Sequence, residues 1–372
     1  MTVETLVSER YAEGAQERQE ALCCPVDYDA SLLKILPQEI IERDYGCGDP
    51  SRYVEAGDVV LDLGSGGGKI CYMAAQIVGD KGAVIGVDMT DEMLELARSY
   101  QGEMASKLGS DRVDFKKGYI QDLSLDVEAM EQFLKDNPVD DLQSLQRLDQ
   151  WKAQQKANTP LITDDSVSLV VSNCVLNLVA QSDRAQMLQE VFRVLKPGGR
   201  VAISDIVCDE TVPDHLQQDA ELWSGCISGA FQEKEFVQAF LDAGFVGVSY
   251  DKWEAEPWQV VEGIEFRSVT LVATKPASSG LIDAGQAVLY RGPFASVEDD
   301  LGNRFSRGDR TAVSKRTFEL LTQGIYEEHF IGMQPAQPTD NGCFCKPAGT
   351  LRAPSETKGG NHQGGEESSG CC

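Results

Sequence analysis

The chain has 372 residues, of which 42% are hydrophobic and 25% charged, a composition that suits a folded protein with more than one domain. Its formal net charge of −27 argues against binding to nucleic acid or to an anionic membrane surface, because both need a basic face. The sequence contains no run of about 18 apolar residues, so we predict no transmembrane helix. Met1–Arg10 lacks the basic and apolar regions of a secretory signal, so we expect none. We therefore expect a cytoplasmic protein without membrane or nucleic-acid partners.

Residues 1–55 are predicted to be a mixed helical and loop segment, with Cys47 in a turn that contains glycine and proline. Apolar runs and helical patterns then alternate along the chain. Strands are expected at 59–63, 83–88, 113–115, 167–172, 200–206, 246–250 and 267–273. Because strands that alternate with helices form sheets covered on both faces, the pattern predicts an α/β fold with a doubly wound, mostly parallel sheet.

The main domain is expected to span residues 56–275. Residues 124–163 interrupt its rhythm with a polar, helical pattern, and we interpret them as a helical insertion. Residues 276–333 contain strand-like and helical pieces that predict a small C-terminal α+β domain. Residues 334–372 are rich in Gly, Pro, Ser and Glu and carry cysteine pairs, a composition that predicts a disordered tail.

A glycine-rich loop, residues 64–68, joins the first expected strand to a helix. Glycines let the backbone approach a ligand closely, and a helix N-terminus carries a partial positive charge. The spacing fits neither the dinucleotide fingerprint nor the phosphate loop. The G-x-G-x-G pattern after Asp62 suits a cofactor with a cationic amino-acid tail better than a pyrophosphate. Asp88, 20 residues beyond Gly68, is placed to accept hydrogen bonds from ribose hydroxyls.

Eleven cysteines are unusual for a chain expected in a reducing compartment, where structural disulfides are rare. Cys174 follows the fourth strand, where ligands of doubly wound sheets bind, and Cys226 lies in a segment of small residues. Cys71 lies near a helix N-terminus, which predicts thiolate character. With Cys47 these residues have no zinc-type spacing, so the pattern alone leaves open whether they share a site or are small buried hydrophobes.

Several segments resemble the arsenite methyltransferase family, and they occur in that family's order over residues 40–275. They are Asp44–Gly48, Leu61–Gly66 with Cys71 and Tyr72, Val87–Thr90, Gly118–Ile120, Val171–Val179, and Trp223–Cys226 with Gly229 and Ala230. The chain departs from that family in its Lys69-Ile70 pair, in the length of the 124–163 insertion and in the cysteine pairs of the tail. The resemblance implies a class I methyltransferase (Rossmann-like) fold with S-adenosylmethionine as the cofactor.

The resemblance also implies roles for individual residues. Cys174 and Cys226 would hold As(III), and Cys47 and Cys71 would complete the binding and redox relay. The cofactor-binding residues would be Asp62, Gly64, Ser65, Gly66, Gly68, Tyr72, Asp88, Met89, Ile120, Gln121 and Asn173. Arsenite and methylarsenite would be the substrates, methylated by attack of the arsenic lone pair on the sulfonium methyl. Thioredoxin or glutathione would reduce the enzyme again after each cycle.

Two other functions fit parts of the sequence. One is a methyltransferase of an organic small molecule with structural cysteines, which predicts that Cys174→Ser leaves the reaction intact. The other is a thiol-based metal or metalloid binding protein without enzymatic activity, against which the intact glycine loop and Asp88 argue. The three histidines form no cluster in the sequence, so we propose no histidine metal site.

Overall fold

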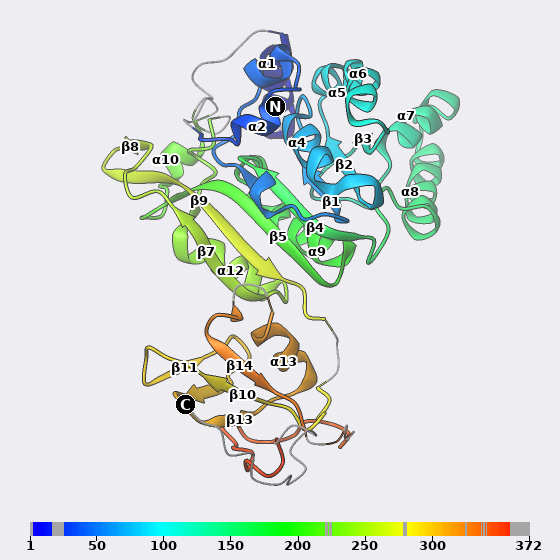
Figure 1. Ribbon diagram of the computed structural model, residues 1–372. Coiled ribbons are helices and arrows are strands. Elements are labelled where there is room, and N and C mark those ends of the chain that lie inside the picture. Colours follow the sequence, from blue (N-terminus) through cyan, green and yellow to red (C-terminus); the bar gives the residue numbers. More distant parts are fainter. Residues whose placement is uncertain are drawn as a thin grey trace. The chain divides into compact units, whose positions relative to one another are not determined.

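The structure, a computed structural model, describes residues 3–16, 26–219, 222, 225–277, 281–323, 326–335, 337, 339 and 341–357. It divides into two compact units, residues 1–275 and 276–372, each described here by itself (Figure 1). The paired cysteines Cys23–Cys24 and Cys371–Cys372 lie outside the described residues.

A nine-stranded mixed sheet forms the centre of the first unit, and its main order is β3-β2-β1-β4-β5-β9-β7. The neighbours from β3 to β5 pair in parallel, whereas β9 runs antiparallel to both β5 and β7. The predicted mostly parallel sheet is therefore confirmed. Its strands are β1 Val59–Leu63, β2 Ala83–Asp88, β3 Val113–Lys117, β4 Val167–Asn173, β5 Leu195–Cys208, β6 Phe231–Gln232, β7 Val246–Trp253, β8 Gln259–Val261 and β9 Ile264–Thr274.

Helices cover both faces of this sheet, as Figure 1 shows. The alternation of side chains along a strand explains why. On β1, Val60 packs in one buried cluster with residues of α4, whereas Leu61 and Leu63 pack in another with residues of α9 and α12. The helices are α1 Val3–Gln16, α2 Ala30–Leu33, α3 Gln38–Glu42, α4 Lys69–Val78, α5 Asp91–Ser99, α6 Gln101–Leu108, α7 Val127–Asp136, α8 Leu142–Asn158, α9 Arg184–Val194, α10 Asp214–Gln217 and α12 Glu233–Asp242, with 3-10 turns η2 Pro50–Tyr53, η3 Gly79–Lys81, η4 Leu176–Leu178 and η5 Gln181–Asp183.

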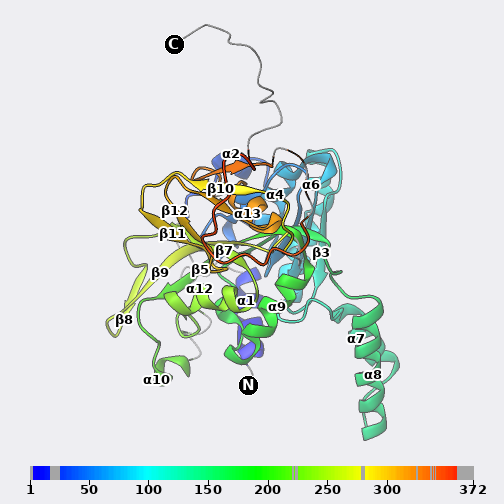
Figure 2. The same cartoon turned by 90° about the horizontal axis from the view of Figure 1, so that it is seen from below.

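Two helices, α7 and α8, occupy the segment interpreted from the sequence as a helical insertion. Asp141 caps α8 by accepting a hydrogen bond from the Ser144 amide. The rings of Phe133 and Trp151 stack with centroids 4.9 Å apart and so join the two helices. Figure 2 shows this pair standing out from the β3 edge of the unit.

The second unit has its own small core. Strands β10 Ala287–Tyr290, β13 Arg310–Ala312 and β14 Phe330–Met333 form one antiparallel sheet, and β11 Ser296–Glu298 pairs with β12 Arg304–Ser306. Helix α13, Lys315–Leu321, is capped by Ser314 and contributes Phe318 to a buried cluster with Val288 and Phe330. A cluster separate from the large sheet lets this unit keep its own interior.

The segment 341–357 differs from the sequence prediction, which placed it in a disordered tail. Its Arg352 side chain is buried and forms an ion pair with Asp283, which is buried as well. Leu351 forms an isolated bridge with Thr311, and Arg310 donates a hydrogen bond of 2.7 Å to the Thr357 hydroxyl. Composition alone predicted disorder because it does not register a single buried ion pair.

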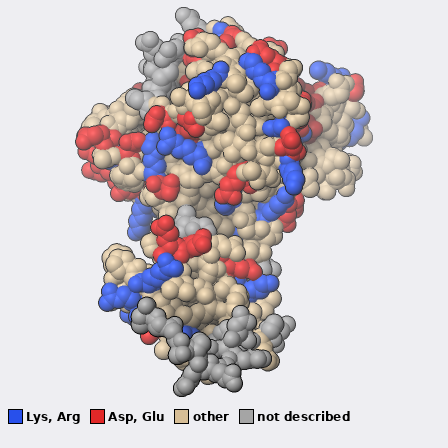
Figure 3. All heavy atoms as spheres, in the orientation of Figure 1, with Lys and Arg blue, Asp and Glu red and all other residues tan. Residues whose placement is uncertain are grey.

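Acidic and basic side chains alternate over the face shown in Figure 3. Ion pairs join some of the described charged residues, for example Arg200 with Glu55 and Asp58. None of the helices in the described ranges has both the length and the apolar character needed to cross a bilayer.

Phe240 tests the packing of α12 on the sheet, because it is fully buried and its ring lies 5.5 Å from that of Phe236 and 5.6 Å from that of Phe245. We expect Phe240→Ala to lower the free energy of unfolding by about 3–5 kcal/mol in urea titrations, through lost contacts and a cavity. The control is Val260→Ala, since Val260 is 58% exposed. Similar losses in the two variants would contradict this packing.

Candidate active site

The glycine loop between β1 and α4 forms one wall of a pocket that Asp88 and Cys174 also line. Gly64, Gly66 and Gly68 have φ values of +68°, +49° and +86°, which side chains rarely adopt. A Cβ on Gly64 would collide with Val175, and one on Gly68 with Phe115. At Gly66, by contrast, a Cβ would lie near only Met93, so a residue with a side chain at this position would extend into the pocket. The loop is thus a cradle that leaves room for a ligand.

Asp88 ends β2 and joins it to the glycine loop. Its carboxylate accepts hydrogen bonds of 2.9 Å from the backbone amides of Gly66 and Thr90. Burial raises the pKa of Asp88, and the two amide donors oppose that rise. Asp88 also lines the pocket, and its role as an acceptor for ribose hydroxyls stays a prediction.

Cys71 lies on α4 and its thiol donates a hydrogen bond of 3.3 Å to Asp62 Oδ2. Burial raises the pKa of Asp62 to about 8. Burial, followed by the charge of Asp62, also raises the pKa of the Cys71 thiol well above its usual value. The expected thiolate character is therefore wrong for this structure, since burial and a neighbouring carboxylate outweigh the helix N-terminus.

The pocket brings together most of the residues predicted from the sequence to bind a cofactor. Those that line it are Asp62, Gly64, Ser65, Gly66, Asp88, Met89, Ile120, Gln121 and Asn173, and Cys174 joins them. Gly68 and Tyr72 are not among the lining residues. Tyr72 points into the protein interior instead, where its hydroxyl donates a hydrogen bond of 2.7 Å to the Ala97 carbonyl.

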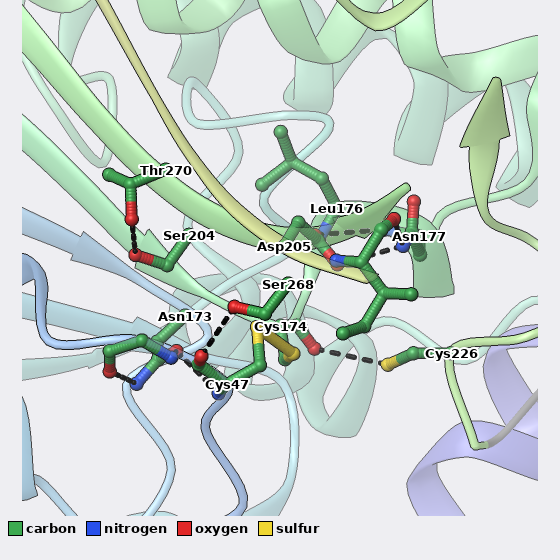
Figure 4. Close-up of a disulfide and its surroundings, with 12 residues drawn as sticks. Cys47, Asn173, Cys174, Leu176, Asn177, Ser204, Asp205, Cys226, Ser268 and Thr270 are labelled. Carbon is green, nitrogen blue, oxygen red and sulfur yellow. Dashed lines mark hydrogen bonds between the residues drawn. A yellow bond between two sulfur atoms is a disulfide. The ribbon is translucent and has the colours of Figure 1, made fainter. Parts of the chain in front are cut away.

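Three of the four predicted cysteines meet at the ends of β4 and β5 (Figure 4). Cys47 and Cys174 form a disulfide, and Cys226 Sγ lies 3.4 Å from the Cys174 carbonyl oxygen. All three are buried in one cluster, whereas Cys71 belongs to another on the α4 face of the sheet. The sulfur atoms of Cys174 and Cys226 and a carboxylate oxygen of Asp205 all lie within 4.8 Å of one another.

The Asn173 side chain positions the Cys47 turn. Its Oδ1 accepts hydrogen bonds of 2.8 Å from the Cys47 amide and 2.9 Å from the Gly48 amide, and its Nδ2 donates to the Gly48 carbonyl at 2.9 Å. The two flanking glycines allow this approach, because a Cβ on Gly46 would collide with Asn173 and one on Gly48 with Ser204. Asn173 was predicted as a cofactor contact, and in this structure its side-chain amide forms three hydrogen bonds with the backbone of Cys47 and Gly48.

Strand β9 fixes the other side of this turn. Ser268 donates a hydrogen bond of 2.7 Å to the Cys47 carbonyl, and the hydroxyls of Ser204 and Thr270 are bonded at 2.9 Å. Ser268 lies opposite Ile206 in the antiparallel β5–β9 pair. Strand β9 thus contributes a hydroxyl that holds the backbone of the Cys47 turn.

Asp205, which the sequence analysis missed, is fully buried beside the cysteines. Its carboxylate accepts hydrogen bonds from the amides of Leu176 at 2.9 Å and Ile206 at 2.8 Å, and from Asn177 Nδ2 at 2.8 Å. Burial raises its pKa to about 6, although these amide donors lower it. An acidic residue inside the apolar run of β5 was the signal that could have indicated it.

Helix α1 and the turn before Cys47 close another side of the pocket with two aromatic residues that were not predicted either. Tyr11 and Tyr45 both line the pocket, with ring centroids 6.1 Å apart in an edge-to-face arrangement. The Tyr45 hydroxyl donates a hydrogen bond of 2.9 Å to the Gly14 carbonyl, which holds α1 against the turn that carries Cys47.

Comparison with known proteins gives this geometry a family context. A family model described as "Methyltransferase domain" matches residues 54–244, and a domain of unknown function, DUF8838, matches residues 277–362. The chain is 30% identical to the arsenite methyltransferase of Aquipseudomonas alcaligenes, over 86% of each chain. It is also 30% identical to the arsenite methyltransferase of Homo sapiens, over 84% of this chain and 77% of the relative.

One solved structure is similar to this chain in its fold. The chain matches the crystal structure of an arsenic(III) S-adenosylmethionine methyltransferase from Chlamydomonas reinhardtii with a TM-score of 0.53 and 27% identity. The match covers 88% of this chain and all of the other.

Asn173→Ala tests whether this side chain holds the Cys47 turn. The variant leaves the amides of Cys47 and Gly48 without their acceptor, so we expect a loss of about 1–3 kcal/mol in the free energy of unfolding. We also expect slower formation of the Cys47–Cys174 disulfide after reduction, followed by mass spectrometry of alkylated protein. The control is Gln132→Ala on α7, whose amide bonds only to exposed Asp136. Wild-type disulfide kinetics in Asn173→Ala would refute this role.

Proposed function

The chain belongs to the arsenite methyltransferase family, and from that premise we propose that it methylates As(III) held by the thiolates of Cys174 and Cys226. The products would be mono- and dimethylated arsenicals, and the role would be arsenic detoxification. The observation that carries the proposal is the meeting of these two sulfur atoms beside the glycine-loop pocket, which Cys174 itself lines. Soft thiolates are the ligands that a soft centre such as As(III) prefers.

The pocket residues suit S-adenosylmethionine as the cofactor, which supplies an electrophilic methyl group on a sulfonium when bound. Asp62 offers a buried carboxylate for a cationic amino-acid tail, and Asp88 offers acceptors for ribose hydroxyls. The open side of Gly66 gives room for the backbone to contact the ligand. Ile120 and Gln121 would flank the adenine, since both line the same pocket.

Substrate loading would need both cysteines as reduced thiols. Two thiols replace two hydroxides of arsenous acid, each hydroxide leaves as water with a thiol proton, and arsenic keeps its oxidation state and its lone pair. Because Cys174 and Cys226 are buried, the bound arsenic would be shielded from water and its lone pair held in a fixed direction. Of these two cysteines, Cys174 lines the pocket, whereas Cys226 is not among the lining residues.

The Cys47–Cys174 disulfide suggests how arsenic could be returned to the trivalent state. Closing this disulfide from two thiols releases two electrons and two protons, which are what reduction of As(V) to As(III) consumes. A thiol reductant, thioredoxin or glutathione, would then reopen the disulfide. The reducing cytoplasm would suit this cycle. Cys71 takes no part in this proposal, because it lies in another cluster and hydrogen-bonds to Asp62.

Asp205 would assist methyl transfer electrostatically. Arsenic gains positive charge as its lone pair forms a bond to carbon, and a carboxylate within 4.8 Å of both sulfur ligands would stabilise that charge. The surrounding amide donors of Leu176 and Ile206 fix the carboxylate before the reaction, so little reorganisation is needed.

The central test of the proposed function is arsenic speciation after incubation with arsenite, S-adenosylmethionine and a thiol reductant. We expect Cys174→Ser to lower methylarsenical formation by about 100-fold or more, because arsenic loses its position against the pocket. Cofactor affinity, measured by calorimetry, should change little. The control is Cys208→Ser, since Cys208 is a buried thiol outside the group formed by Cys174, Cys226 and Asp205. Methylation at wild-type rate by Cys174→Ser would sink the proposal.

Asp205→Asn removes the charge but keeps an oxygen that can accept from the Leu176 amide. We expect kcat to fall by about 100-fold while the affinity for cofactor and the thermal midpoint stay close to wild type. Asp242→Asn, at an exposed position on α12, serves as the control. A folded Asp205→Asn variant with unchanged kcat would show that the carboxylate only holds the η4 turn.

A further inference from the structure

The second unit carries a pair of exposed thiols that the proposed reaction does not use. Cys343 and Cys345 flank Phe344, and their sulfur atoms lie 3.1 Å apart without a disulfide. They fall within residues 277–362, which match a domain of unknown function. Two thiols this close together can bind one ligand atom at the same time, which a single cysteine cannot do.

Backbone pairing holds this pair in place. Cys343 forms an isolated antiparallel bridge with Ile282, and the Phe344 amide donates a hydrogen bond of 2.7 Å to the Leu281 carbonyl. The Asp283 amide donates to the Gly342 carbonyl at 2.8 Å. The Asp283 side chain is in turn buried against Arg352. The backbone that carries the two thiols is therefore bonded to the packed part of this unit.

The number of donors selects the kind of ligand. An atom bonded to both sulfurs at about 2.3 Å, the distance of a zinc–thiolate bond, can span 3.1 Å. A structural zinc site needs four ligands, and within the described residues the only group of three or more ligating side chains is that of Cys174, Asp205 and Cys226. Trivalent arsenic needs only three bonds, so two thiolates and one hydroxide complete it.

We propose that Cys343 and Cys345 form a second binding site for trivalent arsenic, exposed on the C-terminal unit. Binding converts two thiols and arsenous acid into a dithioarsenite with one remaining hydroxide, and two waters leave. Arsenic stays trivalent, so no oxidant or reductant is needed. Because both cysteines are exposed whereas the active-site thiols are buried, arsenic can enter and leave this site without opening the first unit.

The inference adds a binding site to the proposed function, and it rests on that function only for the choice of arsenic as the ligand. The experiment measures arsenic bound per chain in fully reduced, full-length protein after anaerobic incubation with arsenite and desalting. The parent protein carries serine in place of Cys23, Cys24, Cys371 and Cys372, so that these other pairs cannot contribute. We expect about two arsenic atoms per parent chain, one for each thiol site.

Cys343→Ser, Cys345→Ser and the double variant should each lower this number by about one, because a single thiolate cannot chelate. Cys208→Ser, made in the same parent, should leave it unchanged. Methylation at saturating arsenite should stay within about twofold of the parent, since neither exposed cysteine belongs to the proposed active site.

Undiminished arsenic binding in the double variant would overturn the inference, and so would zinc that displaces arsenic from this pair at equal concentration. The two proposals fail separately. Loss of one arsenic in the double variant with no methylated product from the parent would support this site and refute the methyltransferase proposal. Normal methylation with unchanged arsenic binding in the double variant would do the reverse.

Discussion

The side-chain amide of Asn173 joins the Cys47 turn to the end of β4, and the thiol site depends on that connection. Cys47 and Cys174 are 127 residues apart in the sequence. They meet because Asn173 satisfies the backbone of one segment while its neighbour, Cys174, supplies the second sulfur. Ser268 on the antiparallel strand β9 holds the same turn from the other side. Because Cys174 lines the pocket proposed for the cofactor, the thiols lie next to that pocket, as methyl transfer between the two would require.

This arrangement has a cost in stability. Cys174 and Cys226 both have positive φ values, 60° and 62°. In residues other than glycine this conformation destabilises the fold by about 1–3 kcal/mol per residue. Asp205 buries a carboxylate beside them, which is unfavourable unless hydrogen bonds compensate. The amides of Leu176 and Ile206 supply that compensation. Strain and buried charge at one place, offset by a rigid sheet, are typical of sites shaped by function.

Local pattern was sufficient for the sheet and the glycine loop, because strand alternation and glycine spacing act over a few residues. It could not bring Cys47, Cys174 and Cys226 together, since no periodicity links such distant positions, and only the family resemblance grouped them. Cys71 was misjudged because its place near a helix N-terminus is visible in the sequence, whereas its burial beside Asp62 is not. The packing of segment 341–357 was missed for a similar reason, because the burial of Arg352 against Asp283 is not visible in the sequence.

The proposed function requires that one arsenic atom is held by Cys174 and Cys226 beside the pocket proposed for the cofactor. X-ray absorption at the arsenic edge measures it most directly, on reduced Cys343→Ser/Cys345→Ser protein that carries serine at the four cysteines outside the described residues and is loaded with one arsenic per chain. We expect arsenic bonded to at least two sulfurs, and loss of a sulfur neighbour in both Cys174→Ser and Cys226→Ser. An arsenic environment that is unchanged by both substitutions would contradict it.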